Sequence, residues 1–236
     1  MGPPTPKDPA HDPPPEYLRP YSEAVGRHGP CFEALLWNAP ETQRRRFKAI
    51  VQMAPLADRV VADMGSGRAD LAAYLRERDV AYTHYVGVEG VKELLDASRE
   101  RVIADKLPAC EFLPLDFVAD KGVFETLVRD HGVQVFVFSG SLNTLKQKDA
   151  ERVLDRAWDA VASVPGGVLV FNFLSDEGKG RDRVEVGPAR RFETVRMVER
   201  ALARTSRLRV RTDYLDGHDA TIAMFAPRSI EAQPGA

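Results

Sequence analysis

A glycine-containing segment lies where an apolar run gives way to a helix-like pattern. Residues 63–67 read Asp-Met-Gly-Ser-Gly, and apolar side chains then recur at helical spacing over residues 69–78. Glycine at positions 65 and 67 lets the backbone turn tightly and approach a ligand closely, and the helix start behind them offers unpaired N–H groups. Asp63 disfavours phosphate and favours a cationic or hydroxyl-rich ligand. The pattern predicts a ligand-binding loop, with a plain tight turn as the alternative.

Two further acidic residues end the next two predicted strands. Glu89 follows the strand at 82–88, about 20 residues beyond the glycine loop, where nucleotide sites bind ribose hydroxyls. Asp116 and Phe117 follow the strand at 110–115, and an acid beside an aromatic ring suits an adenine. A single Asp at a strand end is usually a helix cap, but acidic residues at three successive strand ends predict a nucleoside site.

These residues resemble the cofactor motifs of class I S-adenosylmethionine-dependent methyltransferases, over roughly residues 40–226. The resemblance implies a Rossmann-like α/β fold, with a doubly wound, seven-stranded, mostly parallel sheet, a C-terminal antiparallel hairpin and helices on both faces. It implies S-adenosylmethionine as cofactor and S-adenosylhomocysteine as product. The glycine loop would contact the amino-acid portion, Glu89 the ribose and Asp116 the adenine amino group. The family's frequent third glycine is Ala69 here, a mild change unless the position needs a positive φ.

A narrower resemblance connects the chain to a bacterial subgroup of these enzymes, mostly of unassigned substrate. It rests on Trp37 with 41–43 and 46–47, Ser139-Gly140 with Asn143, Phe171-Asn172-Phe173, and Asp213-Tyr214-Leu215. It implies that Arg46 binds the cofactor carboxylate; the alternative is that Arg46 belongs to a solvated run at 44–46. The expected cofactor-binding residues are Arg46, Asp63, Gly65, Ser66, Gly67, Glu89, Asp116, Phe117 and Ser139.

Methyl transfer from this cofactor needs mainly alignment of the acceptor, and a base only where the acceptor has a proton to lose. The candidate groups are Asp213, Tyr214 and His28, followed by Asn143 and His218. Asp213 and Tyr214 end a predicted strand close to an acceptor, so we rank them above His218. His28 belongs to residues 21–29, which we expect to fold over the cofactor as a lid. An ordinary surface, capping or packing role is the alternative for the histidines and for Tyr214.

Strand-like and helix-like segments alternate along the chain, which predicts βαβ units and a mostly parallel sheet. The predicted strands are 56–64, 82–88, 110–115, 133–138, 168–174, 208–215 and 220–226. The predicted helices are 41–54, 69–78, 91–103, 122–131, 148–163 and 190–204. An Asp-Gly turn at 216–217 joins the last two strands as a hairpin.

The composition divides the chain into four parts. Residues 1–16 hold seven prolines and almost no large apolar side chains, so they predict a disordered tail. We expect a helical cap or lid at 17–55, a class I methyltransferase domain at 56–228 and a loose tail at 229–236.

Residues 181–211 contain ten arginines and four acidic residues, a local feature that favours an anionic or nucleic-acid substrate. The alternative is the solvated face of one helix and an edge strand, with Phe192, Val195, Val198 and Leu202 facing inward. The fourth strand also lacks the Asn/Asp-Pro-Pro-aromatic sequence that resembles base-amino methyltransferases. We therefore expect a small-molecule acceptor and no nucleic-acid partner, with oxygen, nitrogen and sulfur all open as the accepting atom.

The 236-residue chain has an ordinary globular composition, with 44% hydrophobic and 29% charged residues and a net charge of −2. No apolar run approaches the roughly 18 residues of a membrane span, no signal-peptide pattern is visible, and two cysteines make neither a disulfide framework nor a zinc site. We expect a cytoplasmic monomer or homodimer without a metal. Two other hypotheses stay open: an NAD(P)-dependent Rossmann oxidoreductase, disfavoured by Asp70 in place of a third loop glycine, and a non-catalytic S-adenosylmethionine-binding domain.

Overall fold

The computed structural model describes residues 13–178 and 187–228. The predicted tail at 229–236 and residues 1–12 of the other predicted tail lie outside this part of the chain, as do residues 181–186 of the arginine-rich stretch. Residues 13–16 are exposed. None of the described helices has the length and apolar character that a membrane crossing requires.

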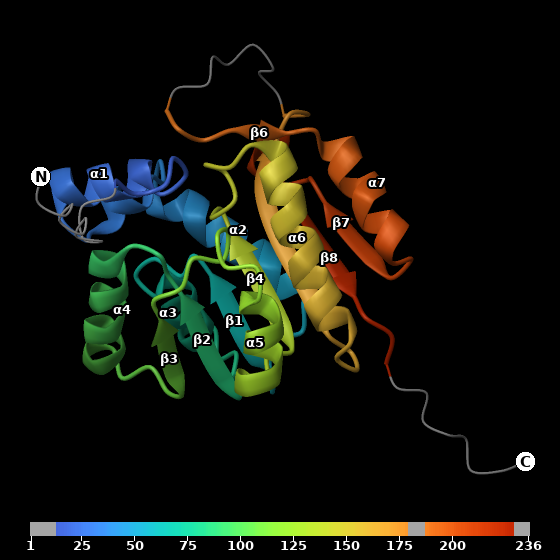
Figure 1. Ribbon diagram of the computed structural model, residues 1–236, viewed down its shortest axis with the longest axis horizontal. Coiled ribbons are helices and arrows are strands. Elements are labelled where there is room, and N and C mark those ends of the chain that lie inside the picture. The colour runs from blue at the N-terminus through green and yellow to red at the C-terminus, as the bar shows by residue number, and fades with distance from the viewer. Residues whose placement is uncertain (1–12, 179–186, 229–236) are drawn as a thin grey trace, which may run out of the picture.

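A central sheet with the strand order β3-β2-β1-β4-β5-β8-β7 organises the described residues, and the two-residue β6 pairs beside β5 (Figure 1). The strands are β1 (Val60–Met64), β2 (His84–Val88), β3 (Cys110–Leu113), β4 (Val135–Ser139), β5 (Val168–Ser175), β6 (Arg191–Phe192), β7 (Leu208–Arg211) and β8 (Asp219–Phe225). β1 to β5 pair in parallel, whereas β8 runs antiparallel to both β5 and β7. The predicted mostly parallel sheet with an antiparallel C-terminal hairpin is confirmed, with β6 as an addition.

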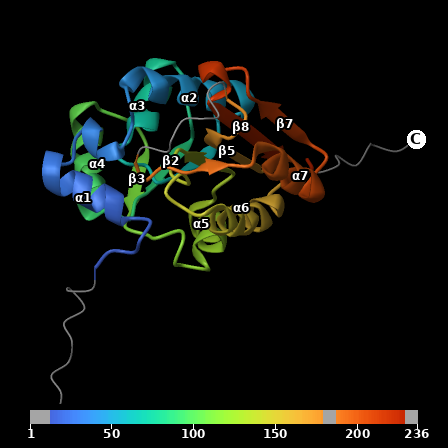
Figure 2. The ribbon, with the colours of Figure 1, turned by 90° about the horizontal axis from the view of Figure 1, so that it is seen from above.

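Helices cover both faces of the sheet, as the doubly wound prediction requires (Figure 2). On one face lie α2 (Pro40–Met53), α3 (Asp70–Glu77) and α4 (Lys92–Ala104), and on the other α5 (Val123–His131), α6 (Gln147–Ala162) and α7 (Thr194–Arg204). The side chains of β4 alternate between the two cores. Val135 and Val137 pack on the first side, and Phe136 and Phe138 on the second. This period of two explains why a continuous apolar run forms a strand that is buried on both faces.

The parallel strands bring the residues that follow them to one edge of the sheet. The N–H groups of Gly65 and Ser66, after β1, donate to the carbonyl of Val88 in β2 at 2.8 and 3.0 Å. Glu89, after β2, donates its N–H to Leu113 in β3 at 3.1 Å. Segments that are far apart in the sequence therefore lie side by side at this edge.

The C-terminal hairpin differs in detail from the prediction. β7 ends at Arg211 rather than at residue 215, and residues 212–218 form a longer connection that contains the 3-10 turn η3 (Leu215–Gly217). Leu215 and Asp216 have φ angles of 51° and 54°. An extended strand cannot include this left-handed region, so the predicted strand does not reach residue 215, and its pairing with β8 ends at Arg211 opposite Thr221.

α7 buries a different face from the predicted one. Thr194, Met197 and Ala201 are buried, whereas Val195 and Leu202 are 61% and 53% exposed. The expectation that Val195 and Leu202 face inward was wrong, because the buried face is rotated by one residue. The other predicted inward residues do pack against the core.

Ion pairs join α7 to α6. Arginines one turn apart on α7 meet acidic residues one turn apart on α6: Arg196 with Glu151 at 2.7 Å, Arg200 with Asp155, and Arg204 with Asp159. This ladder of ion pairs, here called the arginine row, neutralises much of the excess positive charge between 187 and 211.

The predicted cap forms two short helices before α2. They are α1 (Arg19–His28) and the 3-10 helix η2 (Phe32–Leu35). Val25 and Leu35 pack with Val91 and Leu94 around the start of α4. α1 therefore lies beyond the edge toward which the parallel strands point (Figure 1).

Candidate active site

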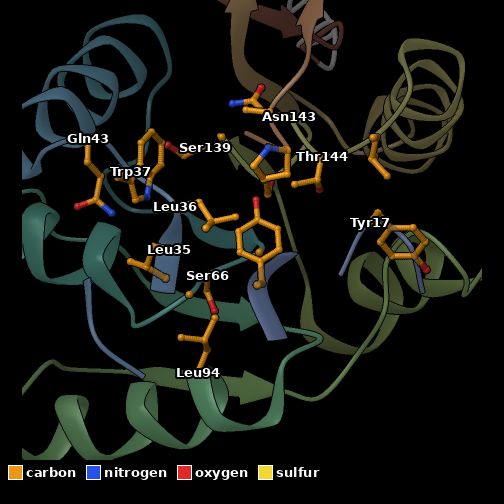
Figure 3. A pocket seen from close by; sticks show the side chains of 18 of the residues that line it. Tyr17, Leu35, Leu36, Trp37, Gln43, Ser66, Leu94, Ser139, Asn143 and Thr144 are labelled. Carbon is orange, nitrogen blue, oxygen red and sulfur yellow. The ribbon is translucent and has the colours of Figure 1, made fainter. Parts of the chain in front are cut away.

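A cavity of about 660 Å³ lies at the carboxyl edge of the parallel strands. Residues from 17 to 47 contribute one side of it, and the loops after β1, β2, β3 and β4 contribute another. Figure 3 shows Tyr17, Leu35 and Trp37 of the N-terminal segment around the same space as Ser66 and Ser139 of the sheet edge. Sites that bury a small molecule measure roughly 300–1,000 Å³, so the cavity has a suitable size for one.

Every predicted cofactor-binding residue lines this cavity: Arg46, Asp63, Gly65, Ser66, Gly67, Glu89, Asp116, Phe117 and Ser139. The parallel strand order gathers them, as the positions of the motifs at strand ends indicated. Their individual binding roles stay predictions.

The glycine loop needs glycine both for its backbone and for space. Gly65 has a φ of 81°, and a Cβ there would lie 2.5 Å from Ser141 Cβ. Gly67 has a φ of 55°, and its Cβ would lie 2.8 Å from Leu35 Cδ2. Ala69 also has a left-handed φ, of 58°. Its replacement of glycine is therefore not mild, because this conformation costs an L-residue about 1–2 kcal/mol.

Two hydroxyl groups beside this loop lack a partner. Ser66 Oγ and Ser141 Oγ are buried and make no hydrogen bond within the described residues, although both residues line the cavity. Buried polar groups are nearly always hydrogen-bonded. The two hydroxyls therefore mark where a polar ligand would supply the missing partners, so the loop fits a nucleoside cofactor with an amino-acid portion.

Two buried acids stand on either side of the loop. Asp63 accepts a hydrogen bond from the Tyr85 hydroxyl, and Glu89 accepts from the Gly67 N–H at 2.8 Å and the Val91 N–H at 2.9 Å. Burial raises the pKa of each carboxyl to about 7, and the hydrogen bonds that each accepts offset part of this rise. A cationic or hydroxyl-bearing ligand would favour their ionised forms.

The two carboxylate oxygens of Asp116 accept hydrogen bonds from different donors. Oδ1 accepts the N–H groups of Val118 and Ala119 at 2.9 and 3.1 Å, the cap that a lone Asp usually makes. Oδ2 accepts from the Tyr17 hydroxyl at 2.6 Å. Oδ2 is therefore the oxygen that takes no part in the cap and could accept from an adenine amino group. In this structure the Tyr17 hydroxyl is its hydrogen-bond donor.

Arg46 is buried and separate from the solvated arginines beside it. Its Nε donates to Asp219, and its guanidinium lies 4.5 Å from the centroid of the Trp37 ring. Arg44 and Arg45 have side chains that are 37% and 55% exposed. The alternative, in which Arg46 is part of a solvated run, does not describe this arrangement.

The three expected catalytic residues do not reach the cavity. Asp213 is exposed and pairs with Arg211 at 2.6 Å, which holds the pKa of this carboxyl below its usual range. Tyr214 is buried, but its hydroxyl is bonded to Thr221 Oγ1 at 2.7 Å, and His28 is exposed at the end of α1. None of the three lines the cavity. Asp213 and Tyr214 lie in the connection after β7, which ends at Arg211, and His28 lies at the exposed end of α1.

The two lower-ranked candidates do line the cavity. Asn143 is buried, and its Oδ1 accepts the Leu174 N–H at 3.4 Å. His218 lies with Nδ1 2.9 Å from Asp219 Oδ2. The geometry thus reverses the order that placed Asp213 and Tyr214 above His218.

Aromatic side chains of the N-terminal segment were missed as site residues. Tyr17, Tyr21 and Trp37 line the cavity. Tyr21 bonds to Thr144, and burial raises its pKa to about 12. A Cβ at Gly140 would lie 2.5 Å from the Trp37 ring. The signal available in the sequence was the recurrence of large aromatic residues within the segment that was expected to form a lid.

The described residues contain no cluster of potential metal ligands. Across 13–178 and 187–228, His, Cys, Asp and Glu side chains nowhere gather in a set of three or more that suits a metal ion.

Comparison with known proteins gives structural matches only. No protein-family model matches the chain, and no curated protein matches it. An O-methyltransferase family protein from Burkholderia thailandensis matches with a TM-score of 0.65 at 17% identity, covering 91% of this chain and 67% of that chain. A SAM dependent methyltransferase from Aquifex aeolicus gives 0.58 at 14%, covering 80% and 94%. The (4+2)-cyclase SpnF gives 0.58 at 13%, covering 90% and 93%.

The structural similarity in these matches establishes the fold. Because the sequence identities are only 13–17%, the matches leave the reaction open. The strand order, the antiparallel last strands and the helices on both faces belong to an arrangement that superposes on the matched methyltransferases with TM-scores of 0.65 and 0.58. The chain therefore has the class I, Rossmann-like fold of S-adenosylmethionine-dependent methyltransferases.

Proposed function

We propose that the protein is an S-adenosylmethionine-dependent methyltransferase that acts on a small-molecule nucleophile. One observation carries this proposal: the glycine loop, Glu89 and Asp116 converge on a single cavity of about 660 Å³ at the carboxyl edge of the sheet. The three features suit the three parts of the cofactor, namely the amino acid, the ribose and the adenine. The fold of the matched methyltransferases supports the same conclusion.

The residues of the cavity have distinct tasks in this proposal. The hydroxyls of Ser66 and Ser141 bond to the amino-acid portion, Glu89 accepts from the ribose hydroxyls, and Asp116 Oδ2 accepts from the adenine amino group once Tyr17 releases it. The bound cofactor supplies a methyl group activated by a sulfonium. The chain itself holds and aligns the reactants, and such orientation contributes on the order of several kcal/mol.

The arginine-rich stretch supports a small acceptor rather than a nucleic acid. A phosphate-binding surface needs cationic side chains that are free to contact the backbone of the polymer. The arginine row instead bonds to acidic residues of α6. Arg207 and Arg209 donate to the carbonyls of Ala226 and Met53.

An NAD(P)-dependent oxidoreductase fits the site less well. Asp70 lines the cavity at the first residue of α3 and pairs with Arg101. A dinucleotide would place its pyrophosphate at such a helix start, where the carboxylate would repel it. A non-catalytic binding domain is the second alternative, and the match to a protein described as a cyclase shows that the fold alone does not specify methyl transfer.

Calorimetric titration of the purified chain with S-adenosylmethionine, S-adenosylhomocysteine and NAD tests the proposal. Both sulfur compounds should bind and NAD should not. Glu89→Ala should weaken their binding at least tenfold, whereas Glu93→Ala, at an exposed position on α4, should leave it unchanged. Binding of NAD without any response to S-adenosylhomocysteine would reject the proposal.

Turnover separates an enzyme from a binding domain. The chain should form S-adenosylhomocysteine when incubated with S-adenosylmethionine and a pool of small metabolites. Tight cofactor binding without turnover on any such pool would support the non-catalytic alternative.

A further inference from the structure

Three side chains from separate segments form a polar row in which Asp219 lies between Arg46 and His218, and both of these line the cavity. Arg46 of α2 donates from Nε to Asp219 Oδ1, and His218 Nδ1 lies 2.9 Å from Asp219 Oδ2. The Asp219 side chain is 0% exposed and that of Arg46 is 7% exposed. The His218 side chain is 26% exposed and lines the cavity.

The partners of Asp219 determine which nitrogen of His218 carries the hydrogen. A carboxylate bonded to a guanidinium is ionised and can only accept hydrogen bonds. We therefore assign the hydrogen to Nδ1, which leaves the lone pair on Nε2, on the opposite side of the ring. The described residues give Nε2 no hydrogen-bond partner. Arg46 and Asp219 thus fix the orientation of the imidazole, and in its neutral form the lone pair lies on Nε2.

We propose that His218 is the base of the reaction and that the acceptor is a phenolic hydroxyl. This inference rests on the proposed function and deepens it. The acceptor oxygen forms a bond to the methyl carbon as the carbon–sulfur bond breaks, and the electron pair of that bond stays on sulfur. The phenol proton passes to Nε2 of His218. Asp219, as a positioning residue, stabilises the imidazolium that results, and Arg46 holds Asp219 in place.

The strength of the base selects the kind of acceptor. Imidazole and phenol have ordinary pKa values of about 6.5 and 10, close enough for proton transfer within a bonded pair. An aliphatic alcohol is far too weak an acid for this base. The cavity walls agree, because Leu36, Trp37 and Leu174 offer apolar and aromatic surface to a flat ring.

The charged groups that contact the His218–Asp219 pair or line the same cavity lie on three elements. They are Asp219 at the start of β8, Arg46 on α2 and Arg191 on β6, which lines the same cavity. In the proposal Asp219 opposes the charge that develops on the imidazole, and the hydrogen bond from Arg46 Nε holds the Asp219 carboxylate in place.

Nitrogen-15 NMR of the chain labelled in its histidine rings tests the positioning independently of any activity. At about pH 8, above the ordinary imidazole pKa, His218 should show the Nδ1–H tautomer, with its signals assigned by their loss in His218→Gln. In Asp219→Asn the amide directs its oxygen to Arg46 and its NH₂ to Nδ1, so the tautomer should change to Nε2–H. His28 serves as the unchanged reference. A wild-type His218 in the Nε2–H form would overturn the proposal.

The probe 4-nitrophenol tests the acceptor class, because its ionised form absorbs at a different wavelength. It is added to the chain saturated with S-adenosylhomocysteine, at a pH where the free probe is half ionised. The bound probe should shift toward the phenolate in the wild type and in His28→Gln. His218→Gln should lose at least two thirds of this shift. Absence of binding, or an equal shift in His218→Gln, refutes a phenolic acceptor beside this base.

The variants also keep this proposal separate from the proposed function. His218→Gln leaves the bond between Arg46 and Asp219 intact, so it carries the test even where Asp219→Asn fails to fold. His218→Gln should therefore bind S-adenosylhomocysteine with wild-type affinity. If the wild type does not bind S-adenosylhomocysteine, the proposed function fails. If it binds but the tautomer or probe result is the opposite of that expected, only the role of His218 fails.

Discussion

Lowering the pH from about 8 to about 6 should weaken S-adenosylmethionine binding by ten- to a hundredfold. Asp63 and Glu89 line the cavity, and burial raises the pKa of each to about 7. The bound cation and ribose hydroxyls need the ionised carboxylates. For one group with a pKa of about 7 that must be ionised, the apparent affinity falls about tenfold between these pH values, or about 1.4 kcal/mol. Two such groups acting independently give about a hundredfold.

Calorimetry at several pH values, repeated in buffers with different heats of ionisation, measures both the affinity and the protons released. At about pH 7 each half-protonated carboxyl should release about half a proton on binding. Glu89→Gln should remove its share of the pH dependence, whereas the exposed Glu93→Gln should not. His218→Gln should also keep the dependence, which excludes the imidazole as its source.

An affinity that stays constant between about pH 8 and 6 would refute this reasoning, because it would mean that the acids are ionised throughout or do not face the ligand. The same raised pKa values have a consequence for the ligand-free chain. Its folded form keeps protons that the unfolded form has released, so the free energy of unfolding should fall as the pH rises from about 4 to about 7.

Three further predictions concern the loop, the N-terminal segment and the arginine row. Gly67→Ala and Gly132→Ala, at φ angles of 55° and 66°, should each lose about 1–2 kcal/mol of stability in denaturant titrations. Only Gly67→Ala, whose Cβ would crowd Leu35, should also weaken S-adenosylhomocysteine binding, and equal affinities would contradict the crowding. Tyr17→Phe should speed amide hydrogen exchange in α1 by removing a bond worth about 1 kcal/mol, without lowering cofactor affinity; unchanged exchange would mean that the hydroxyl does not hold the segment. Arg200→Met, at a side chain 40% exposed, should cost less than about 1 kcal/mol in thermal unfolding, and the wild type should not bind duplex RNA; salt-sensitive RNA binding lost in this variant would point to a nucleic-acid acceptor.

The fold was predictable because its signals are local. A buried parallel strand needs apolar side chains on both faces, so the run at 133–138 predicted a strand, and β4 covers Val135–Ser139. Amphipathic spacing placed α5 within one residue of its observed bounds. The glycine loop and the acids at strand ends were predictable as one site because parallel strands end at a common edge.

The sequence by itself thus determined the sheet, the layers and the residues that gather at the cavity. Tertiary structure decided which polar groups face the acceptor side. Arg46 and Asp219 are 173 residues apart, and no local pattern predicts that they meet. β7 ends at Arg211 and a left-handed turn follows at 215–216; Asp213 lies in solvent, and His218, after the turn, lines the cavity. Strand and helix periods are properties of neighbouring residues, whereas the partner of a buried charge depends on how distant elements pack.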